Sequence, residues 1–361
     1  MSRARTFADL ATASETGSLA SPNMAINGDM AVHQRVATDT HSDKAVDQIQ
    51  LVKSNLDTAD FATKHQSLGD IDPFADALEI TCTTADTSIG ANELIYLVKS
   101  FEAQNLQHLS FGSSIAKTTT LSFHVKSNLT GTFSVGLVTQ DGTARNIGST
   151  YTIDSANTWE KKSITFDGDT SATIANDNGH GLDMTFILSA GSNWTSTANS
   201  SWANYANGRL AHGHNVNIAS STSNEFYITG IQWELGDVAT PYKHESFADN
   251  LARCRRYFQQ YDATNAYTRF ALGVAYDGSS IAAPLNLPVQ MRAAPTFGSS
   301  GNFDTLPDTV DLDTLSVQHA TNEMVEFRAV DSGNGLTANR PYVIRSDNDT
   351  SAKIQFISEL A

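Results

Sequence analysis

The sequence is dominated by short runs in which apolar and polar residues alternate, each bounded by residues that form turns. Three such runs are "LSFHVKS" at 121–127, "TFSVGLVT" at 132–139 and "KSITFDG" at 162–168. An alternation with a period of two places the apolar side chains on one face of a β-strand. Clusters such as "SNLTG", "TQDGT" and "NDNGHG" separate the runs, and their Gly, Asn and Asp residues favour turns. The pattern predicts an all-β fold, a β-sandwich of the jelly-roll kind.

The run "MTFILSA" at 184–190 differs from the others because it is almost continuously apolar. A strand that shows no alternation has apolar side chains on both faces. We therefore expect this strand to lie in the middle of a sheet and to be covered on both sides.

The stretch "EFYITGIQWEL" at 225–235 changes phase in its middle. Phe226 and Ile228 share one face of a regular strand, whereas Ile231 and Trp233 have the opposite parity. Gly230 stands at the change, and a β-bulge there would turn both sets toward one core. A "GD" turn and Pro241 follow, and because proline cannot continue a central ladder, they end the strand.

The segment "SFADNLARCRRYFQQY" at 246–261 has the pattern of a helix. Ser246 is in place to cap it, with Asp249 three residues later. The apolar residues recur at alternating spacings of four and three, as in a heptad seam; they are Phe247, Leu251, Cys254, Phe258 and Tyr261. The seam is compatible with packing on the chain's own sandwich or with contact between subunits, and we favour the shared seam.

A chain of 361 residues is long enough for two domains. We divide it into an N-terminal arm at 1–22, a jelly-roll domain at 23–245, a connecting helix at 246–262 and a smaller C-terminal β-sandwich at 263–361. The arm is interpreted either as an attachment segment or as a disordered tail. Five strand-like runs in the last segment, including "NEMVEFRAV" and "RPYVIRS", predict the second β-domain.

Charge and composition exclude several classes of partner. The formal net charge of −16 disfavours nucleic acid and anionic membrane surfaces, both of which require clustered Lys and Arg. No apolar run reaches the length of a signal peptide or a membrane span, so neither export by a cleaved signal nor membrane insertion is expected. The two cysteines, Cys82 and Cys254, form no metal or dithiol motif.

Aromatic residues in a polar stretch give a candidate site for sugars. The stretch "SNWTSTANSSWANYANG" contains Trp194, Trp202 and Tyr205 among Ser, Asn and Gly residues. Exposed rings stack on sugar rings, and polar neighbours supply hydrogen bonds. The alternative is that these rings cover the core of the sandwich, as large aromatic side chains commonly do.

No catalytic motif is present. The sequence has no nucleophile elbow, no phosphate-binding glycine loop and no HExxH zinc motif. Acidic residues are frequent, but nothing in their spacing selects the pair of carboxylates that a glycosidase requires. We therefore expect a protein that is not an enzyme.

Several segments together resemble bacteriophage tail fibre and tail appendage proteins. They are "NMAINGDMAVHQR" at 23–35, "FYITGIQWELGDVATPY" at 226–242, "LARCRRYFQQY" at 251–261, "LPVQMRAAPTF" at 287–297 and "IQFISEL" at 354–360. They occur in the order found in that family and span most of residues 23–361. Met30 replaces the usual aromatic residue and Arg255 the usual Gln. The arm at 1–22 matches nothing in the family.

The resemblance implies a virion protein assembled in the host cytoplasm, a homotrimer bound to other tail proteins. It implies a jelly-roll domain like a carbohydrate-binding module, and hence recognition of a host-surface glycan. By analogy with such modules it also implies a possible Ca²⁺ site at Asn27, Asp29 and Glu234, although Ca²⁺ requires six or more oxygen ligands. Two alternatives are a purely structural or adaptor virion protein and a carbohydrate-binding module of a secreted protein.

Overall fold

The computed structural model describes residues 23–35 and 43–360, so the predicted arm at 1–22 lies outside the described residues. The chain forms two compact units, one extending to Asn250 and including Leu360, the other spanning Leu251–Glu359. Nearly all regular structure is β-strand, which confirms the predicted all-β class. No helix within the described residues is long and apolar enough to cross a membrane.

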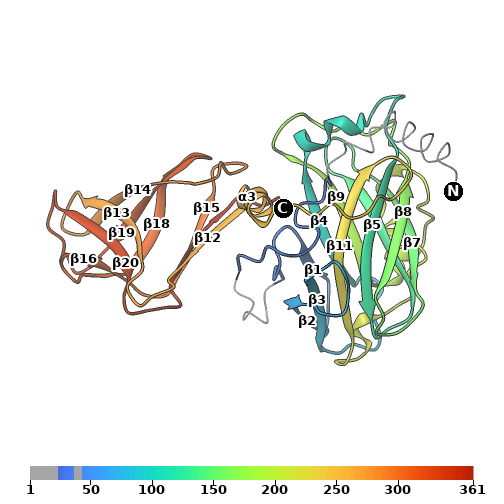
Figure 1. Cartoon of the computed structure of the whole chain (residues 1–361), viewed down its shortest axis with the longest axis horizontal. Coiled ribbons are helices and arrows are strands. Elements are labelled where there is room, and N and C mark those ends of the chain that lie inside the picture. The colour runs from blue at the N-terminus through green and yellow to red at the C-terminus, as the bar shows by residue number, and fades with distance from the viewer. Residues whose placement is uncertain (1–22, 36–42, 361) are drawn as a thin grey trace. The chain divides into compact units, whose positions relative to one another are not determined.

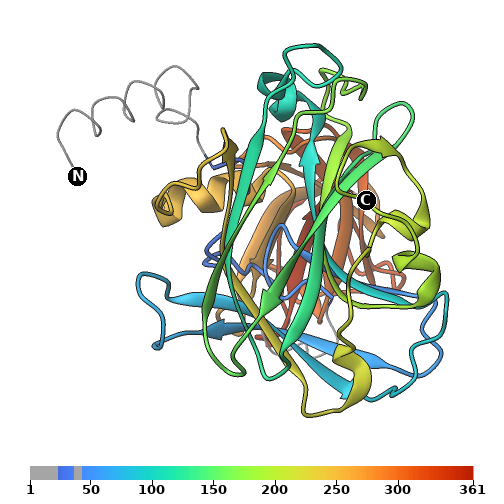
Figure 2. The ribbon, with the colours of Figure 1, turned by 90° about the vertical axis from the view of Figure 1, so that its right-hand side faces the viewer.

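The first unit is a sandwich of two antiparallel sheets (Figures 1 and 2). The six-stranded sheet has, in spatial order, β1 (Gln50–Ser54), β4 (Leu94–Glu102), β9 (His180–Ala190), β6 (Gly131–Thr139), β7 (Arg145–Ile153) and β10 (Ala203–Asn204). The five-stranded sheet has β2 (Asp60–Ser67), β3 (Asp76–Thr84), β11 (Glu225–Leu235), β5 (Thr119–Ser127) and β8 (Glu160–Phe166). Short helical turns are η1 (Ala103–Leu109), α2 (Ser192–Thr195), η2 (Asn207–Arg209) and η3 (Ile218–Ser220).

The alternating runs form strands whose apolar faces meet in one core, as predicted. Phe123 of β5, Phe133 of β6 and Phe226 of β11 are fully buried in this core. The continuous run lies in β9, which stands between β4 and β6 in the middle of its sheet. One face of β9 contributes Phe186 to the main core, while Ile187 on the other face joins a smaller apolar cluster outside the sandwich. Burial on both faces is therefore confirmed.

The predicted bulge is present at Gly230. Thr229 pairs with His124 of β5 and Gln232 pairs with Ser122, so two residues of β11 lie opposite one residue of β5. Gly230 has a φ of 63°, a conformation that residues with a Cβ atom rarely adopt. The extra residue restores the phase, and both Phe226 and Trp233 are fully buried.

Beyond the bulge, the N-terminal segment 23–28 replaces β3 as the neighbour of β11. Strand β3 pairs with β11 only as far as Ile228. The backbone N–H of Ile231 donates to Gly28 O (2.9 Å), and that of Trp233 donates to the Asn23 side chain (2.9 Å). A Cβ atom at Gly28 would collide with Ile231 O. Asn23 and Gly28 thus complete the sheet, which gives a structural role to the "NMAING" motif.

The predicted helix at 246–262 is correct only in its first half. Helix α3 covers Phe247–Arg255, and Ser246 caps it, its hydroxyl accepting a hydrogen bond from the Asp249 N–H (3.2 Å). Residues Phe258–Asp262 instead form strand β12, which pairs with β21 (Lys353–Ile357). Pairing with the chain's own C-terminal strand satisfies the backbone of these residues, so the heptad seam does not form. Phe247, the first seam residue, is 60% exposed.

The second unit packs two antiparallel sheets around its own core. The three-stranded sheet has the order β12, β21 and β15 (Thr296–Ser300). The seven-stranded sheet has β17 (Asp311–Leu312), β16 (Phe303–Leu306), β20 (Pro341–Ser346), β13 (Arg269–Ala275), β14 (Ser280–Asn286), β19 (Met324–Val330) and β18 (Thr314–Ala320). Phe327 contacts Phe297 and Phe356, joining the two sheets. Strands fall on all the runs predicted in this segment.

We predict that Gly230→Val lowers the free energy of unfolding of the first unit by about 3 kcal/mol or more. The valine would be held at a positive φ, and its Cβ would lie 2.5 Å from Phe74 Cζ and 2.9 Å from His124 Nδ1. Calorimetric unfolding, which can resolve transitions of the two units, measures the effect. Gly69→Val is the control: no atom lies within 4 Å of a Cβ there, so it should change stability by less than about 0.5 kcal/mol. Equal melting temperatures of the first unit in Gly230→Val and Gly69→Val would show that the bulge does not require glycine.

Candidate functional site

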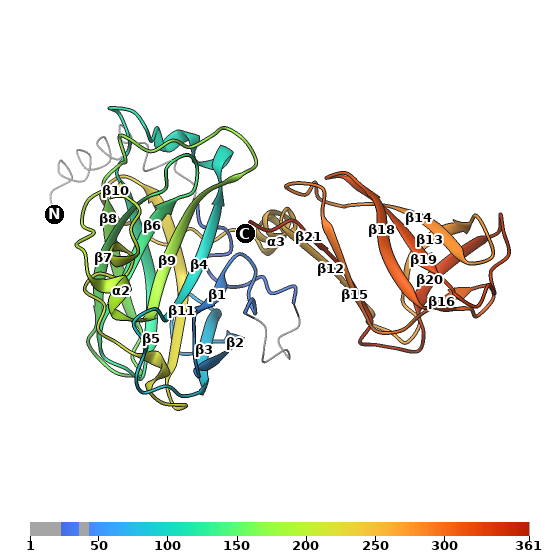
Figure 3. The same ribbon diagram turned by 180° about the vertical axis from the view of Figure 1, so that it is seen from behind.

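A cleft lies on the outward face of the six-stranded sheet of the first unit. Its volume is about 240 Å³. The eight residues that line it are Tyr96, Val138, Gln140, Ala144, Asp183, Thr185, Tyr205 and Leu210. The floor comes from adjacent strands β4, β9 and β6, and Figure 3 views this sheet from its outer side.

The register of the sheet sets the floor of the cleft. Asp183 of β9 pairs with Ser100 of β4 on one side and with Val138 of β6 on the other. Tyr96, which pairs with Ile187, lies on the same face of β4 as Ser100 because the two are four residues apart. Strands with polar residues on their outward face therefore bring a tyrosine, a carboxylate and small side chains together.

The wall of the cleft comes from the segment that carries α2, β10 and η2, which contributes Tyr205 and Leu210 to the lining. Strand β10 of this segment pairs with β7 at the edge of the sheet. Arg209 fixes this segment: its Nε donates to Asn146 Oδ1 of β7 (3.1 Å), and its Nη1 donates to Ala198 O (2.5 Å). Asn199 O accepts the N–H of Gly148 (2.8 Å), and a side chain at Gly148 would collide with Asn199. The wall is thus held before any ligand arrives, which lowers the entropy lost on binding.

Two tyrosines, Tyr96 and Tyr205, line the cleft. Tyr205, 37% exposed, is positioned by its N–H, which donates to Ala144 O (2.8 Å). Within the described residues, neither its hydroxyl nor that of Tyr96 makes a hydrogen bond. Burial, followed by the negative charge of Asp183 and by Tyr205, raises the pKa of Tyr96, and burial raises the pKa of Tyr205. Both hydroxyls therefore keep their protons at neutral pH and can donate as well as accept.

The three aromatic residues predicted to bind glycans lie in different surroundings. Tyr205 lines the cleft. Trp194 packs on the small cluster that contains Leu210 and Ile187, and its Nε1 donates to Asn92 O (3.0 Å). Trp202 packs on the main core and its Nε1 donates to Asp167 O (2.7 Å). The two tryptophans are half-buried, and the indole N–H of each is hydrogen-bonded within the chain.

Sequence reasoning missed Tyr96, Gln140 and Asp183. Each is a single polar residue at a strand or strand end, with no motif around it, and only the register of β4, β9 and β6 brings them together. The signal that the sequence offers is the polarity of a side chain such as that of Asp183, because a carboxylate is rarely fully buried and so favours the outward face of its strand.

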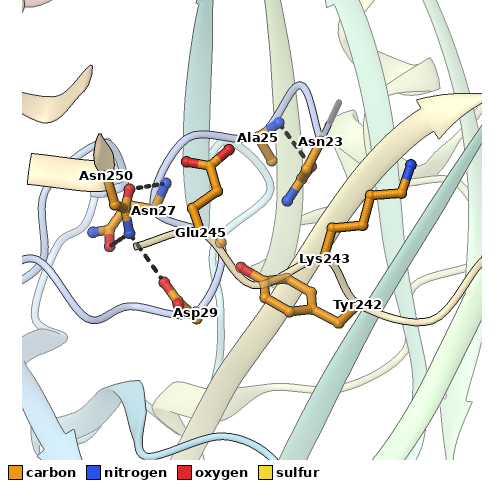
Figure 4. Close-up of a pocket in the computed structure, with 9 residues that line it drawn as sticks. Asn23, Ala25, Asn27, Asp29, Tyr242, Lys243, Glu245 and Asn250 are labelled. Carbon is orange, nitrogen blue, oxygen red and sulfur yellow. Dashed lines mark hydrogen bonds between the residues drawn. The ribbon is translucent and has the colours of Figure 1, made fainter. Parts of the chain in front are cut away.

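The residues predicted to bind calcium have structural partners instead. Asn27 Nδ2 donates to Val32 O (2.8 Å) and Asp47 O (2.9 Å). Figure 4 shows the Asn250 side chain between Asn27 and Asp29, hydrogen-bonded to both. The cavity beside them, about 10 Å³, has room for about one water molecule.

Glu234 does not line this cavity. Its carboxylate accepts hydrogen bonds from the N–H of Thr240 (2.8 Å), the hydroxyl of Thr240 (2.7 Å) and the amide of Gln232 (2.9 Å). These bonds hold the turn that follows β11. Across residues 23–35 and 43–360, no group of three or more His, Cys, Asp or Glu side chains is placed to hold a metal ion. The described geometry therefore lends the calcium assignment no support.

Comparison with known proteins yields only distant structural likenesses. No protein-family model and no curated protein sequence matches the chain. A bacteriophage CBA120 tailspike protein 4 enzymatically active domain matches at 12% identity and a TM-score of 0.32, over 59% of this chain and 21% of the tailspike chain. The family 11 carbohydrate-binding module of a Clostridium thermocellum cellulosomal cellulase matches at 13% identity and a TM-score of 0.28, over 55% and 94%. At such scores these all-β neighbours carry no argument about what this chain binds.

We predict that Asn27→Asp lowers the free energy of unfolding by about 3 kcal/mol, equally in Ca²⁺ and in EDTA. The substitution replaces the amide that donates to two carbonyls by a buried carboxylate, which cannot donate. Thermal unfolding of the variant and of the wild-type protein, with and without Ca²⁺, measures this change in the free energy of unfolding. A calcium site would give the opposite result, because the added carboxylate would then strengthen metal binding and Ca²⁺ would restore the stability of the variant.

Proposed function

We propose that the first unit binds a glycan in the cleft on the outer face of its six-stranded sheet. The observation that carries the proposal is the pairing of Tyr96 and Tyr205 with the polar floor formed by Gln140, Asp183 and Thr185. Aromatic rings contact the C–H faces of sugars, while amide, hydroxyl and carboxylate groups bond to their hydroxyls. The cleft, at about 240 Å³, is slightly smaller than the usual range for small-molecule sites, roughly 300–1,000 Å³, which suits a short stretch of a glycan.

The proposal is binding without cleavage. Glycoside hydrolysis generally requires two carboxyl groups on opposite sides of the scissile bond. Asp183 is the one carboxylate among the eight residues that line the cleft. Its three hydrogen-bond donors hold it in place on the floor, so it is arranged as a binding group.

We further propose that this binding serves a virion appendage that recognises the host surface, with the phage virion as its location. The support is the set of tail-protein motifs in the sequence. Two of them meet in the structure, since Asn23 and Gly28 bond to the bulged half of β11. A site of this size binds weakly on its own, and many copies on one particle would supply the affinity through avidity.

A purely structural role is the second candidate, and an apolar row on the second unit favours it. Leu272, Val274 and Tyr276 on and after β13 are 64%, 49% and 47% exposed. Strand β13 lies between β14 and β20, where Val274 pairs with Ala282 and Pro341. An exposed apolar patch on a soluble protein generally marks an interface. We propose that a second copy of the chain covers it, in a homotrimer.

Glycan binding predicts that Tyr205→Ala and Tyr96→Ala each weaken binding by about tenfold, corresponding to the loss of one ring contact of roughly 1–1.5 kcal/mol. Tyr205 is partly exposed, so its loss should leave the melting temperature unchanged. Binding to a glycan array, followed by calorimetric titration, measures the effect. Trp159→Ala is the control: Trp159 contacts Lys126 and Tyr227 of the five-stranded sheet. An array on which the wild-type protein binds nothing would contradict the proposed function.

Self-association predicts a mass of about three times the 38.8 kDa chain in light scattering. Replacing Leu272 and Val274 by Asp should give a monomer with an unchanged fold, because both side chains are exposed. Ile115→Asp is the matched control, since Ile115 is an isolated apolar residue with 65% exposure. A wild-type monomer at micromolar concentration would contradict this second role.

A further inference from the structure

The floor of the cleft carries one formal charge, and it is negative. Of the eight lining residues, Asp183 is the one Asp or Glu, and none is Lys, Arg or His. Its side chain is 14% exposed, so solvent and salt screen it less than a surface group. A ligand in the cleft therefore meets a carboxylate.

Hydrogen bonds on both oxygens fix this carboxylate. Ser100 Oγ (2.6 Å) and His180 Nε2 (2.7 Å) donate to Oδ1, and Gln140 Nε2 (2.7 Å) donates to Oδ2. A carboxylate can accept about four hydrogen bonds, so Oδ2 retains capacity for one more donor. The group that completes the set must bring a hydrogen, as a sugar hydroxyl, amide or ammonium does and a ligand carboxylate does not.

The two arginines of the wall region, Arg145 and Arg209, are bonded to other groups of the chain. Arg145 Nε lies 2.6 Å from Asp169, which is almost fully buried and compensates its charge. Arg209 donates to Asn146 and to the carbonyls of Ala198 and Ser201. Neither arginine lines the cleft, so the lining provides no guanidinium group that could form an ion pair with an acidic sugar.

The charge of Asp183 acts on Tyr96, which lies on the neighbouring strand of the floor. After burial, Asp183 is the main cause of the raised pKa of Tyr96, ahead of Tyr205. A group that enters between these residues experiences the same negative field. Placing a second carboxylate against Asp183 would therefore be unfavourable, because like charges brought together in an interface cost several kcal/mol.

We propose that Asp183 makes the cleft select glycans by charge. It admits neutral sugars and sugars that bear an ammonium group, and it rejects uronic and sialic acids whose carboxylate would face it. The selection depends on an unfavourable contact with the wrong ligand as well as on a favourable contact with the right one. This inference rests on the proposed glycan binding of the first unit.

The test compares glycans that share a backbone and differ in charge. The probes are oligogalacturonates and their methyl esters, chitosan and chitin oligomers, and the C6-carboxylate form of any other neutral glycan that binds on the array. For the wild-type protein we expect each neutral form to bind at least about tenfold more tightly than its carboxylate form. The ratio should shrink as salt rises from about 0.05 M to about 0.5 M, because salt screens the repulsion.

Two variants test the role of Asp183 itself. In Asp183→Asn the ratio of neutral to acidic binding should fall toward about one, and the exposed amide of Gln140 can turn its oxygen toward the new Nδ2. Gln140→Lys places a cation beside Asp183 and should also admit acidic glycans; Gln140 is exposed, so this variant tests the proposal even if Asp183→Asn fails to fold. Asp154→Asn removes an equal charge at a side chain that is 74% exposed and should leave the ratio unchanged.

The outcomes separate this inference from the function on which it rests. If no glycan binds the wild-type protein, both the proposed function and the selectivity are wrong. If acidic and neutral forms bind equally, the glycan site stands and the selectivity is overturned. If Asp154→Asn changes the ratio as much as Asp183→Asn does, the net charge of the protein is responsible, and the role assigned to Asp183 is overturned.

Discussion

The first unit depends on the backbone pairing of strand β11, to which three segments are hydrogen-bonded. The bulge at Gly230 allows all three to pair with the one strand. Strand β5 pairs along most of its length. On its other edge, β3 pairs before the bulge and the segment 23–28 bonds after it. Without the extra residue at Gly230, Trp233 would turn out of the core and the backbone of Ile231 would lose its partner in the N-terminal segment. One glycine at a φ of 63° therefore controls both the packing of the sandwich and its closure.

The cleft follows from the same architecture. A sheet with one face buried in the core leaves its other face to solvent unless a further segment covers it. Here the segment 192–210 covers part of that face: Trp194 packs on the cluster that contains Leu94 and Ile187. Strand β10 of this segment pairs with β7 at the edge of the sheet, and Tyr205, which follows β10, becomes part of a wall. Arg209, bonded to Asn146 and to the carbonyls of that segment, sets where the wall stands. Tyr205 faces the strand floor as a consequence.

The sequence predicts most of this scaffold and little of the site. Alternation in β5, β6 and β8, the doubly buried β9 and the bulge at Gly230 all follow from local patterns, because burial in a sandwich has a fixed period. The helix prediction was wrong from Phe258 onward, since the pairing of β12 with β21 joins residues about one hundred positions apart and leaves no local signal. The cleft was missed for the same reason. Of the residues that line the cleft, the aromatic stretch in the sequence indicates only Tyr205, whereas strand register brings Tyr96 and Asp183 to it.

The motif residues and the cleft residues belong to separate sets, and this separation bears on function. The polar groups of the motif residues make hydrogen bonds within the fold, as shown by Asn23, Gly28 and Glu234. None of the segments that resemble tail proteins contains Tyr96, Gln140, Asp183 or Tyr205. A resemblance carried by such motifs therefore predicts how the chain folds and leaves its ligand undetermined. Substitutions in the wall segment and at the outward residues of β4 and β9 would leave the hydrogen bonds of β11 with the segment 23–28 in place.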